Sequence, residues 1–131
     1  MGRHGLRRDR ASKCEAMRRG EIRWVALTLG GEREGRAQRP AVIVSNDGAN
    51  AAAARRGVGV VTVVPLSTSS EPARPFQVSL PAGVGGLRRE AKALAEQVRT
   101  VDASRVGPSI GAVPLEYLRK IDDALRIHLG L

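Results

Sequence analysis

Residues 38–47 read QRPAVIVSND, and this stretch decides which fold the chain is expected to adopt. Pro40 favours an extended residue before it and cannot donate a hydrogen bond within a sheet, so it marks the first residue of a strand. Residues 41–44 are apolar and mostly β-branched, which is typical of a short buried strand. The turn-forming sequence SNDG follows at 45–48. The pattern therefore holds Arg39 at the entrance of a strand, where an arginine suits an oxyanion or a phosphate.

The segments on either side of this strand predict a small α+β domain that is mainly β. Short β-branched runs predict strands over 22–27, 39–45, 57–66, 75–80, 91–100 and 110–113. The stretch 28–38 is rich in Gly, Glu and Arg and is expected to be a mobile loop. The alanine run 51–54 favours a helical turn. Many short strands and one terminal helix predict a closed or nearly closed antiparallel barrel.

The terminal helix is expected to begin at Pro114, where the missing N–H of proline costs nothing. Apolar residues then follow at spacings of three and four and form one face: Leu115, Leu118, Ile121, Leu125 and Leu129. Asp122 and Asp123 are adjacent, so they point to different sides of the helix. We interpret them as a solvated helix face and not as a metal site.

The composition fits one basic domain. The chain has 131 residues and a formal net charge of +9. Residues 1–16 hold five basic and two acidic side chains with little apolar periodicity, and they are expected to form a disordered basic tail before a domain over 17–131. A basic domain implies a polyanionic partner, with nucleic acid first, although solubility is an alternative reason for the charge.

Several classes of protein are excluded by what the sequence lacks. Cys14 is the single cysteine, so neither an internal disulfide nor a cysteine metal site is expected. The sequence has no apolar run of about 20 residues and no secretory signal, which predicts a cytoplasmic protein without a membrane partner. His4 and His128 are not near loops that pair them, so a two-histidine ribonuclease is not expected. No cofactor and no metal are predicted.

Further segments occur in an order that carries a family resemblance. They read MRRGEI at 17–22, VVPLSTS at 63–69, PFQV at 75–78, AEQVRTVD at 95–102 and IDDALRIHL at 121–129. Together with the Arg-Pro strand they resemble the MazF/PemK family of toxin endoribonucleases. The resemblance covers 17–131 and implies an SH3-like antiparallel barrel of the MazF/CcdB type with a C-terminal helix. It suggests little more than a loop over 46–56.

The resemblance also implies a function and partners. The chain is expected to be the toxin of a type II toxin–antitoxin system and a metal-independent, sequence-selective endoribonuclease (an mRNA interferase). It would cleave single-stranded mRNA to 2′,3′-cyclic phosphate and 5′-hydroxyl ends. The expected partners are single-stranded RNA, a second copy of the chain in a homodimer, and a MazE-like antitoxin. The acidic, apolar tail of that antitoxin would lie in a groove at the dimer interface.

The chemistry of RNA cleavage suits the residues that the resemblance selects. RNA supplies its own nucleophile, so a protein needs to align the 2′-hydroxyl and stabilise the added negative charge. The resemblance implies that Arg39 and Ser67 form the catalytic pair, with Thr68 in place of Ser67 if the alignment slips by one residue. Glu34, five residues before Arg39, is their expected acidic partner. The family loop usually reads Gly-Ser-Glu, whereas this chain has ERE at 32–34.

Four residues are expected to bind RNA: Gln38, Thr68, Gln97 and Arg99. The amide of Gln97 suits the edge of a base. Each site residue also has a structural interpretation. Arg39 would then be a surface arginine bonded to a carbonyl, Ser67 a turn-capping hydroxyl, Glu34 a solvated loop charge, and Gln97 a polar residue on a sheet face.

Two other functions fit the same barrel. The first is a CcdB-like toxin that inhibits DNA gyrase by binding, without enzymatic activity. The second is a simple nucleic-acid-binding barrel, for which salt-dependent binding without cleavage is expected. The chain has only three aromatic residues, Trp24, Phe76 and Tyr117, which disfavours a single-strand binder that stacks bases on rings. The Arg-Pro strand followed by Ser67 favours the nuclease.

Overall fold

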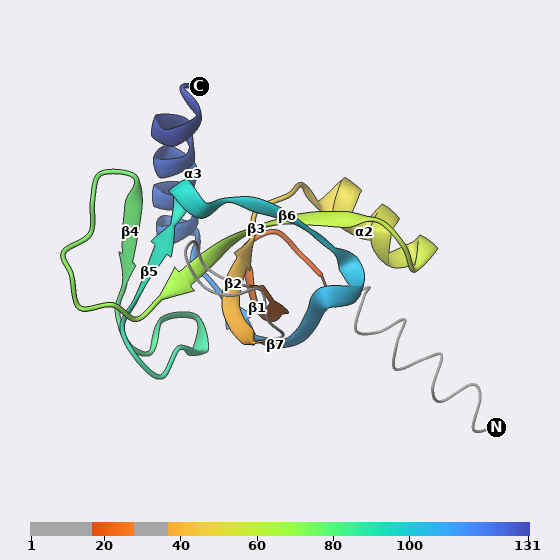
Figure 1. Cartoon of the computed structure of the whole chain (residues 1–131), viewed down its shortest axis with the longest axis horizontal. Coiled ribbons are helices and arrows are strands. Elements are labelled where there is room, and N and C mark those ends of the chain that lie inside the picture. Colours follow the sequence, from red (N-terminus) through yellow and green to blue (C-terminus); the bar gives the residue numbers. More distant parts are fainter. Residues whose placement is uncertain (1–16, 28–36) are drawn as a thin grey trace.

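The computed structural model describes residues 17–27 and 37–131; Glu34 and the expected basic tail lie outside these ranges. The described chain forms seven strands and two α-helices (Figure 1). In chain order these are β1 (Glu21–Ala26), β2 (Gln38–Ile43), α2 (Asp47–Arg56), β3 (Val60–Ser67), β4 (Gln77–Leu80), β5 (Ala91–Leu94), β6 (Arg99–Asp102), β7 (Val106–Ala112) and α3 (Leu115–Leu129). None of the helices in these ranges is long and apolar enough to cross a membrane.

All strand pairs are antiparallel, and β3 lies at the centre of the sheet. The strand order is β4-β5-β3-β2-β1-β7, and β6 pairs with β3 beside β5. Figure 1 shows β1, β2, β3, β6 and β7 curling around a common centre, whereas β4 and β5 extend away from them beside α3. The recorded pairs of the described strands do not join the two ends of this path. The fold is therefore a barrel-like antiparallel sheet with a C-terminal helix, as the sequence predicts, although the described strands do not close it.

Strands β2 and β3 bury side chains on both faces of the sheet. Side chains alternate between faces along a strand, so odd-numbered and even-numbered residues enter different cores. The core inside the curl includes Ala41, Ile43, Val61 and Val63, which α2 covers with Ala53 and Ala54. The core on the other face includes Val42, Val64 and Leu66, which α3 covers with Ile121 and Ala124. One central strand thus takes part in both cores.

Helix α2 is a full helix of 10 residues where the resemblance suggests little more than a loop. Its ends carry the expected capping groups. The Asn46 side chain accepts a hydrogen bond from the Ala49 N–H at 2.8 Å, and Gly57 takes the left-handed conformation that commonly ends a helix. The alanine run predicted helix correctly, and the loop expectation was wrong because local propensity and both caps agree here.

The predicted strand over 91–100 follows β3 but is interrupted in the middle. Leu66 pairs with Ala93 and Val63 pairs with Arg99, so three steps along β3 correspond to six steps along its partner. The three extra residues form a 3₁₀ turn, Ala95–Gln97. This turn lifts Glu96 and Gln97 out of the ladder.

Two other strand boundaries differ from the expectation. Residues 75–76 form a turn, so β4 begins only at Gln77. Strand β7 starts at Val106, four residues before the predicted start, and it contains Pro108. Strand β7 ends the strand order, where a proline is tolerated because one side of the strand needs no ladder donor.

Helix α3 begins after Pro114 and covers its core with only part of the predicted apolar face. Ile121 is fully buried, and Leu118 and Leu125 are partly buried against the same core. Leu115 and Leu129, at the two ends of the face, are 60% and 53% exposed. The barrel therefore leaves both ends of the stripe uncovered.

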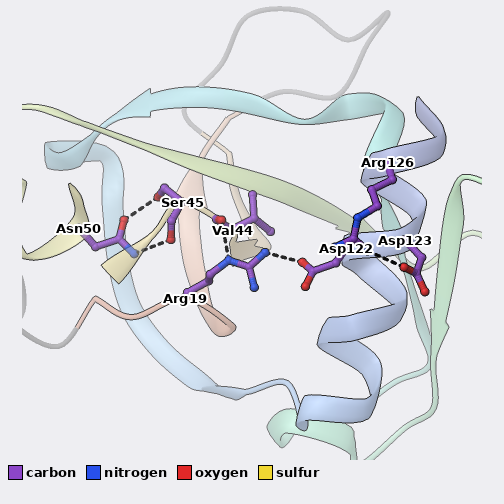
Figure 2. A network of polar contacts seen from close by, with 7 residues as sticks. All are labelled: Arg19, Val44, Ser45, Asn50, Asp122, Asp123 and Arg126. Atoms are coloured by element: carbon purple, nitrogen blue, oxygen red, sulfur yellow. Dashed lines mark hydrogen bonds and ion pairs between the residues drawn. The ribbon is translucent and has the colours of Figure 1, made fainter. Parts of the chain in front are cut away.

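A polar network joins the start of the described chain to α3 (Figure 2). The Arg19 side chain donates from Nε to the Val44 carbonyl at 2.9 Å and forms an ion pair with Asp122. Asp123 points to another side of the helix and pairs with Arg126 at 2.7 Å. The two aspartates do diverge as predicted, but Asp122 is a tertiary ion-pair partner and not simply a solvated charge.

Candidate active site

Arg39 and Ser67 lie at the same end of the β2–β3 ladder. The ladder ends with the pair Ala41 and Pro65. Arg39 lies two residues before Ala41, and Ser67 lies two residues after Pro65. Because the strands are antiparallel and side chains alternate with a period of two, both residues belong to the same end and the same face. Continuing the register would set Arg39 opposite Ser67. Pro40 and Pro65 lack an N–H, which accounts for the end of the ladder at this point.

The same face continues as a polar row across the neighbouring strands. Ser67 at the end of β3 pairs with Lys92 of β5, and Lys92 pairs in turn with Ser79 of β4. Directly opposed residues of an antiparallel pair project to the same side, so the three side chains form one row. On the other side of β2, Arg39 pairs with the buried Val25. The inner face of the curl thus changes from apolar to polar between Val25 and Ser67.

A pocket of about 340 Å³ opens over this polar row. Its lining includes Ser67, Gln77, Lys92 and Glu96, together with the exposed Arg74. The Ser67 hydroxyl accepts a hydrogen bond from the Ser69 N–H at 3.2 Å, so it does cap the turn after β3. Accepting a bond uses only a lone pair, and the hydroxyl keeps its own proton for donation into the pocket.

Glu96 places a carboxylate in the wall of this pocket. Gln77 donates from Nε2 to Glu96 Oε2 at 2.7 Å and accepts from the Arg74 N–H at 3.1 Å, which fixes both side chains. The second oxygen of Glu96, Oε1, is buried and has no hydrogen-bond partner in the parts of the chain that the structure describes. A buried carboxylate oxygen without a partner suits a donor from a ligand, such as a ribose hydroxyl or a base N–H.

The amino-acid sequence matches a known family. A family model described as "PemK-like, MazF-like toxin of type II toxin-antitoxin system" matches residues 18–129. The chain belongs to this family. It is 48% identical over 115 residues to endoribonuclease MazF9 of Mycobacterium tuberculosis, which covers 88% of this chain and 98% of that relative. Endoribonuclease EndoA of Bacillus subtilis is 30% identical over 118 residues, covering 88% and 96%.

Solved structures agree with the fold of this MazF-type toxin. One is an endoribonuclease in complex with its cognate antitoxin from a mycobacterial species. It superposes with a TM-score of 0.67 at 27% sequence identity, covering 88% of this chain and 97% of that one. The resemblance to MazF/PemK toxins, read from the sequence, is thereby confirmed together with the barrel-like fold.

The remaining predicted RNA-binding residues of the toxin lie at different distances from the pocket. Thr68 is exposed directly after β3 and lines a neighbouring pocket of about 350 Å³. Arg99 is half-buried at the start of β6 and pairs with Val63, four residues before Ser67 on the same strand. Gln38 is exposed at the start of β2. Gln97 is half-buried in the 3₁₀ turn, and the pocket is lined by its neighbour Glu96.

Of the residues that line this pocket, only Ser67 was a predicted site residue, and Glu96 and Lys92 are two of those that the sequence analysis did not select. Glu96 precedes Gln97 in the same motif, and only the 3₁₀ turn decides which of the two lines the cavity. Lys92 carried a signal, because it is the one charge in the apolar run 91–95. A charge inside a predicted buried strand is unfavourable unless it has a partner or a function.

Both acidic and basic side chains line the pocket. Within residues 17–27 and 37–131, no three His, Cys, Asp or Glu side chains gather as a metal site would require.

Away from the pocket, the pKa of Asp102 is lowered by hydrogen bonds from the backbone N–H and hydroxyl of Ser104. That aspartate therefore stays ionised as the cap of the short turn that follows β6.

Proposed function

We propose that this MazF-type endoribonuclease cleaves single-stranded mRNA by using the substrate's own 2′-hydroxyl as the nucleophile, without a metal ion. The products would be a 2′,3′-cyclic phosphate and a 5′-hydroxyl. The observation that carries this proposal is the position of Arg39 and Ser67 at one end and on one face of the β2–β3 ladder. Two donors on one face suit a single phosphate.

In the proposed step, the 2′-hydroxyl gives up its proton to the surrounding water as its oxygen attacks phosphorus. The bond from phosphorus to the 5′-oxygen breaks, and that oxygen takes up one proton, so no net proton is gained or lost. Arg39 would bind the non-bridging oxygens with its planar fork and stabilise the charge that grows on them. Ser67 would donate a second hydrogen bond. The pKa of an arginine, above about 12, makes it a poor general base, so its proposed role is electrostatic. Glu34 is proposed as the acidic partner on the basis of the family resemblance.

The proposed RNA contacts beyond the scissile phosphate are Gln38, Thr68, Gln97 and Arg99. They come from four segments: the start of β2, the residue after β3, the 3₁₀ turn Ala95–Gln97 and the start of β6. The identity to relatives named endoribonucleases favours cleavage over the two alternatives, a gyrase inhibitor or a simple nucleic-acid-binding barrel. Both alternatives predict binding without cleavage, so one assay with purified protein separates them.

We expect cleavage of single-stranded RNA to continue at an unchanged rate in excess EDTA, because the proposed role of Arg39 is to supply the positive charge that a metal ion supplies in other nucleases. A substrate with 2′-deoxyribose at the cleaved position should resist, because it lacks the nucleophile. End analysis of the fragments is the measurement, and the unmodified RNA is the control. Activity that disappears on chelation and returns with magnesium would refute the proposed chemistry.

We also propose that the toxin is a homodimer and that a MazE-like antitoxin with an acidic, apolar tail binds it. Helix α3 supports the first part, because Leu115 and Leu129, which belong to its apolar face, are each more than half exposed. Exposed apolar side chains on one face of a helix commonly mark an interface. The relative solved with its cognate antitoxin supports the second part.

Sedimentation equilibrium at micromolar concentration is expected to give twice the 14.0 kDa mass of one chain. Introducing lysine at both Leu115 and Leu129 should shift the protein to monomer, because a charge is costly in a buried interface. Val58→Lys is the matched control, since Val58 is as exposed as Leu115, at 59% against 60%, and lies beyond the end of α2. A monomer mass for the unmodified protein would contradict the dimer.

A further inference from the structure

We propose that Lys92 binds an RNA phosphate next to the scissile one, in a subsite built from β3, β5 and the loop after β3. This inference rests on the proposed function, because it assigns a substrate contact of the same site. It adds a specific cation to the site and predicts which part of the RNA that cation binds.

The first observation is that Lys92 is a buried cation with no acidic partner among residues 17–27 and 37–131. Its side chain belongs to a residue that is only 7% exposed. The ammonium donates one hydrogen bond, to the backbone carbonyl of Glu71. No carboxylate of the described chain forms a salt bridge with it. An ammonium has three donors, and burying its charge is unfavourable unless an anion compensates it.

The second observation is that Lys92 forms part of the wall of two adjoining pockets. The pocket of about 340 Å³ contains Ser67, and the pocket of about 350 Å³ contains Thr68 and Arg89. Several hydroxyl groups lie around the lysine, since Ser69, Ser70 and Ser79 also line the second pocket. Acidic residues line the pockets too: Glu90 lines the second and Glu96 the first. Glu71 lines both pockets as well, but the atom that it gives to Lys92 is its backbone carbonyl. A cation among hydroxyl donors suits a phosphate better than it suits a base edge or an apolar side chain.

The third observation is the distance from the proposed catalytic pair. Ser67 and Lys92 are directly opposed on neighbouring strands, and such residues have Cα atoms about 4.5–5.5 Å apart. Their side chains project to the same face. If Arg39 and Ser67 bind the scissile phosphate, the next phosphate along the strand passes Lys92. The RNA backbone would then cross the sheet along the row Ser67, Lys92, Ser79.

The competing role for Lys92 is to fasten the loop after β3 through the Glu71 carbonyl. The two roles predict opposite effects on stability. Loss of a fastener lowers the melting temperature, whereas replacing an uncompensated buried charge with a methionine of similar length is often neutral or stabilising. Lys92→Met therefore tests the charge. Lys92→Gln keeps a donor for the carbonyl and removes only the charge, so it serves if the methionine variant folds poorly.

The experiment measures binding of an RNA that carries 2′-deoxyribose at the cleaved position. Each phosphate in turn is replaced by a neutral methylphosphonate, and the salt dependence of binding is recorded. Wild-type protein should bind more weakly when a phosphate adjacent to the scissile one is neutral, and Lys92→Met should be insensitive to that replacement. The slope of log K against log salt should fall by about 0.7 in Lys92→Met and Lys92→Gln. Arg56→Met, an exposed cation at the end of α2, is the charge-matched control and should keep sensitivity to the same phosphate.

Three outcomes would overturn the proposal. Equal sensitivity of wild type and both Lys92 variants to every methylphosphonate would show that Lys92 binds no phosphate. A large loss of melting temperature in Lys92→Met with an unchanged salt slope would assign the residue to fastening the loop. A changed affinity for an acidic peptide with unchanged RNA binding would assign it to a protein partner. If wild-type protein neither binds nor cleaves RNA, the proposed function itself fails and this inference fails with it.

Discussion

Arg39→Ala is expected to lower the rate of RNA cleavage by on the order of 10²–10³ or more. The proposed role of Arg39 is to hold fixed positive charge against the phosphate in the transition state, and water that enters its place must reorganise during the reaction. Arg39→Lys should also be strongly impaired, because a compact ammonium does not replace a planar fork that binds two oxygens. Single-turnover cleavage of a labelled RNA is the measurement.

A loss of cleavage assigns Arg39 to the catalytic site only if the Arg39 variants remain folded. Arg39 lies at the start of β2 and is only half-buried, so we expect both variants to unfold close to the wild-type temperature. Arg56→Ala removes the same charge from the far end of α2 and should cleave at the wild-type rate. Ser67→Ala should lower the rate more than Thr68→Ala if the register is assigned correctly. Full activity of a folded Arg39 variant would remove this residue from the catalytic site.

Asn50→Ala is expected to reduce the free energy of unfolding by about 2–4 kcal/mol. Asn50 is fully buried, donates from Nδ2 to the Ser45 carbonyl at 2.9 Å and accepts from the Ser45 hydroxyl at 2.5 Å (Figure 2). That hydroxyl in turn accepts from the Thr62 N–H at 3.0 Å. Alanine would leave the carbonyl of the half-buried Ser45 without its partner and a small cavity between α2 and β3. Urea unfolding followed by circular dichroism measures the difference.

Asn46→Ala provides the matched comparison on the same helix. Asn46 is exposed and caps α2 through one hydrogen bond, so its loss should cost only about 1 kcal/mol. Equal losses in the two variants would mean that the buried network adds nothing beyond the cap. Cleavage by folded Asn50→Ala protein at low temperature should stay close to that of the wild type, because the network lies away from the pocket.

Local features made much of the fold predictable. Pro40 with the β-branched run after it indicated β2, and Pro114 with spacings of three and four indicated α3. Local sequence also accounts for helix α2. Asn46 caps its start, the alanine run favours helix, and Gly57 ends it. The expectation of a loop there came from the family resemblance, whereas the alanine run correctly indicated helix.

The interruption of the strand between β5 and β6 could not be predicted from the sequence. Residues 95–97 contain no glycine or proline, and the turn there exists because β3 pairs with two strands in registers that differ by three residues. The same holds for the pocket. The sequence placed Arg39 and Ser67 before and after known strands, but only the register brings them to one face. For Lys92, only the structure shows that the side chain is buried and that no acidic partner lies among the described residues.

The central position of β3 has a consequence for the cooperativity of the molecule. Because its residues pack alternately into both cores, neither core can stay closed once β3 leaves. Release of β3 is therefore expected to be global, and its buried amides should exchange with solvent only through complete unfolding. The proposed site lies at the C-terminal end of this strand. Its rigidity, which electrostatic catalysis requires, is then supplied by the stability of the whole domain and not by the loops around it.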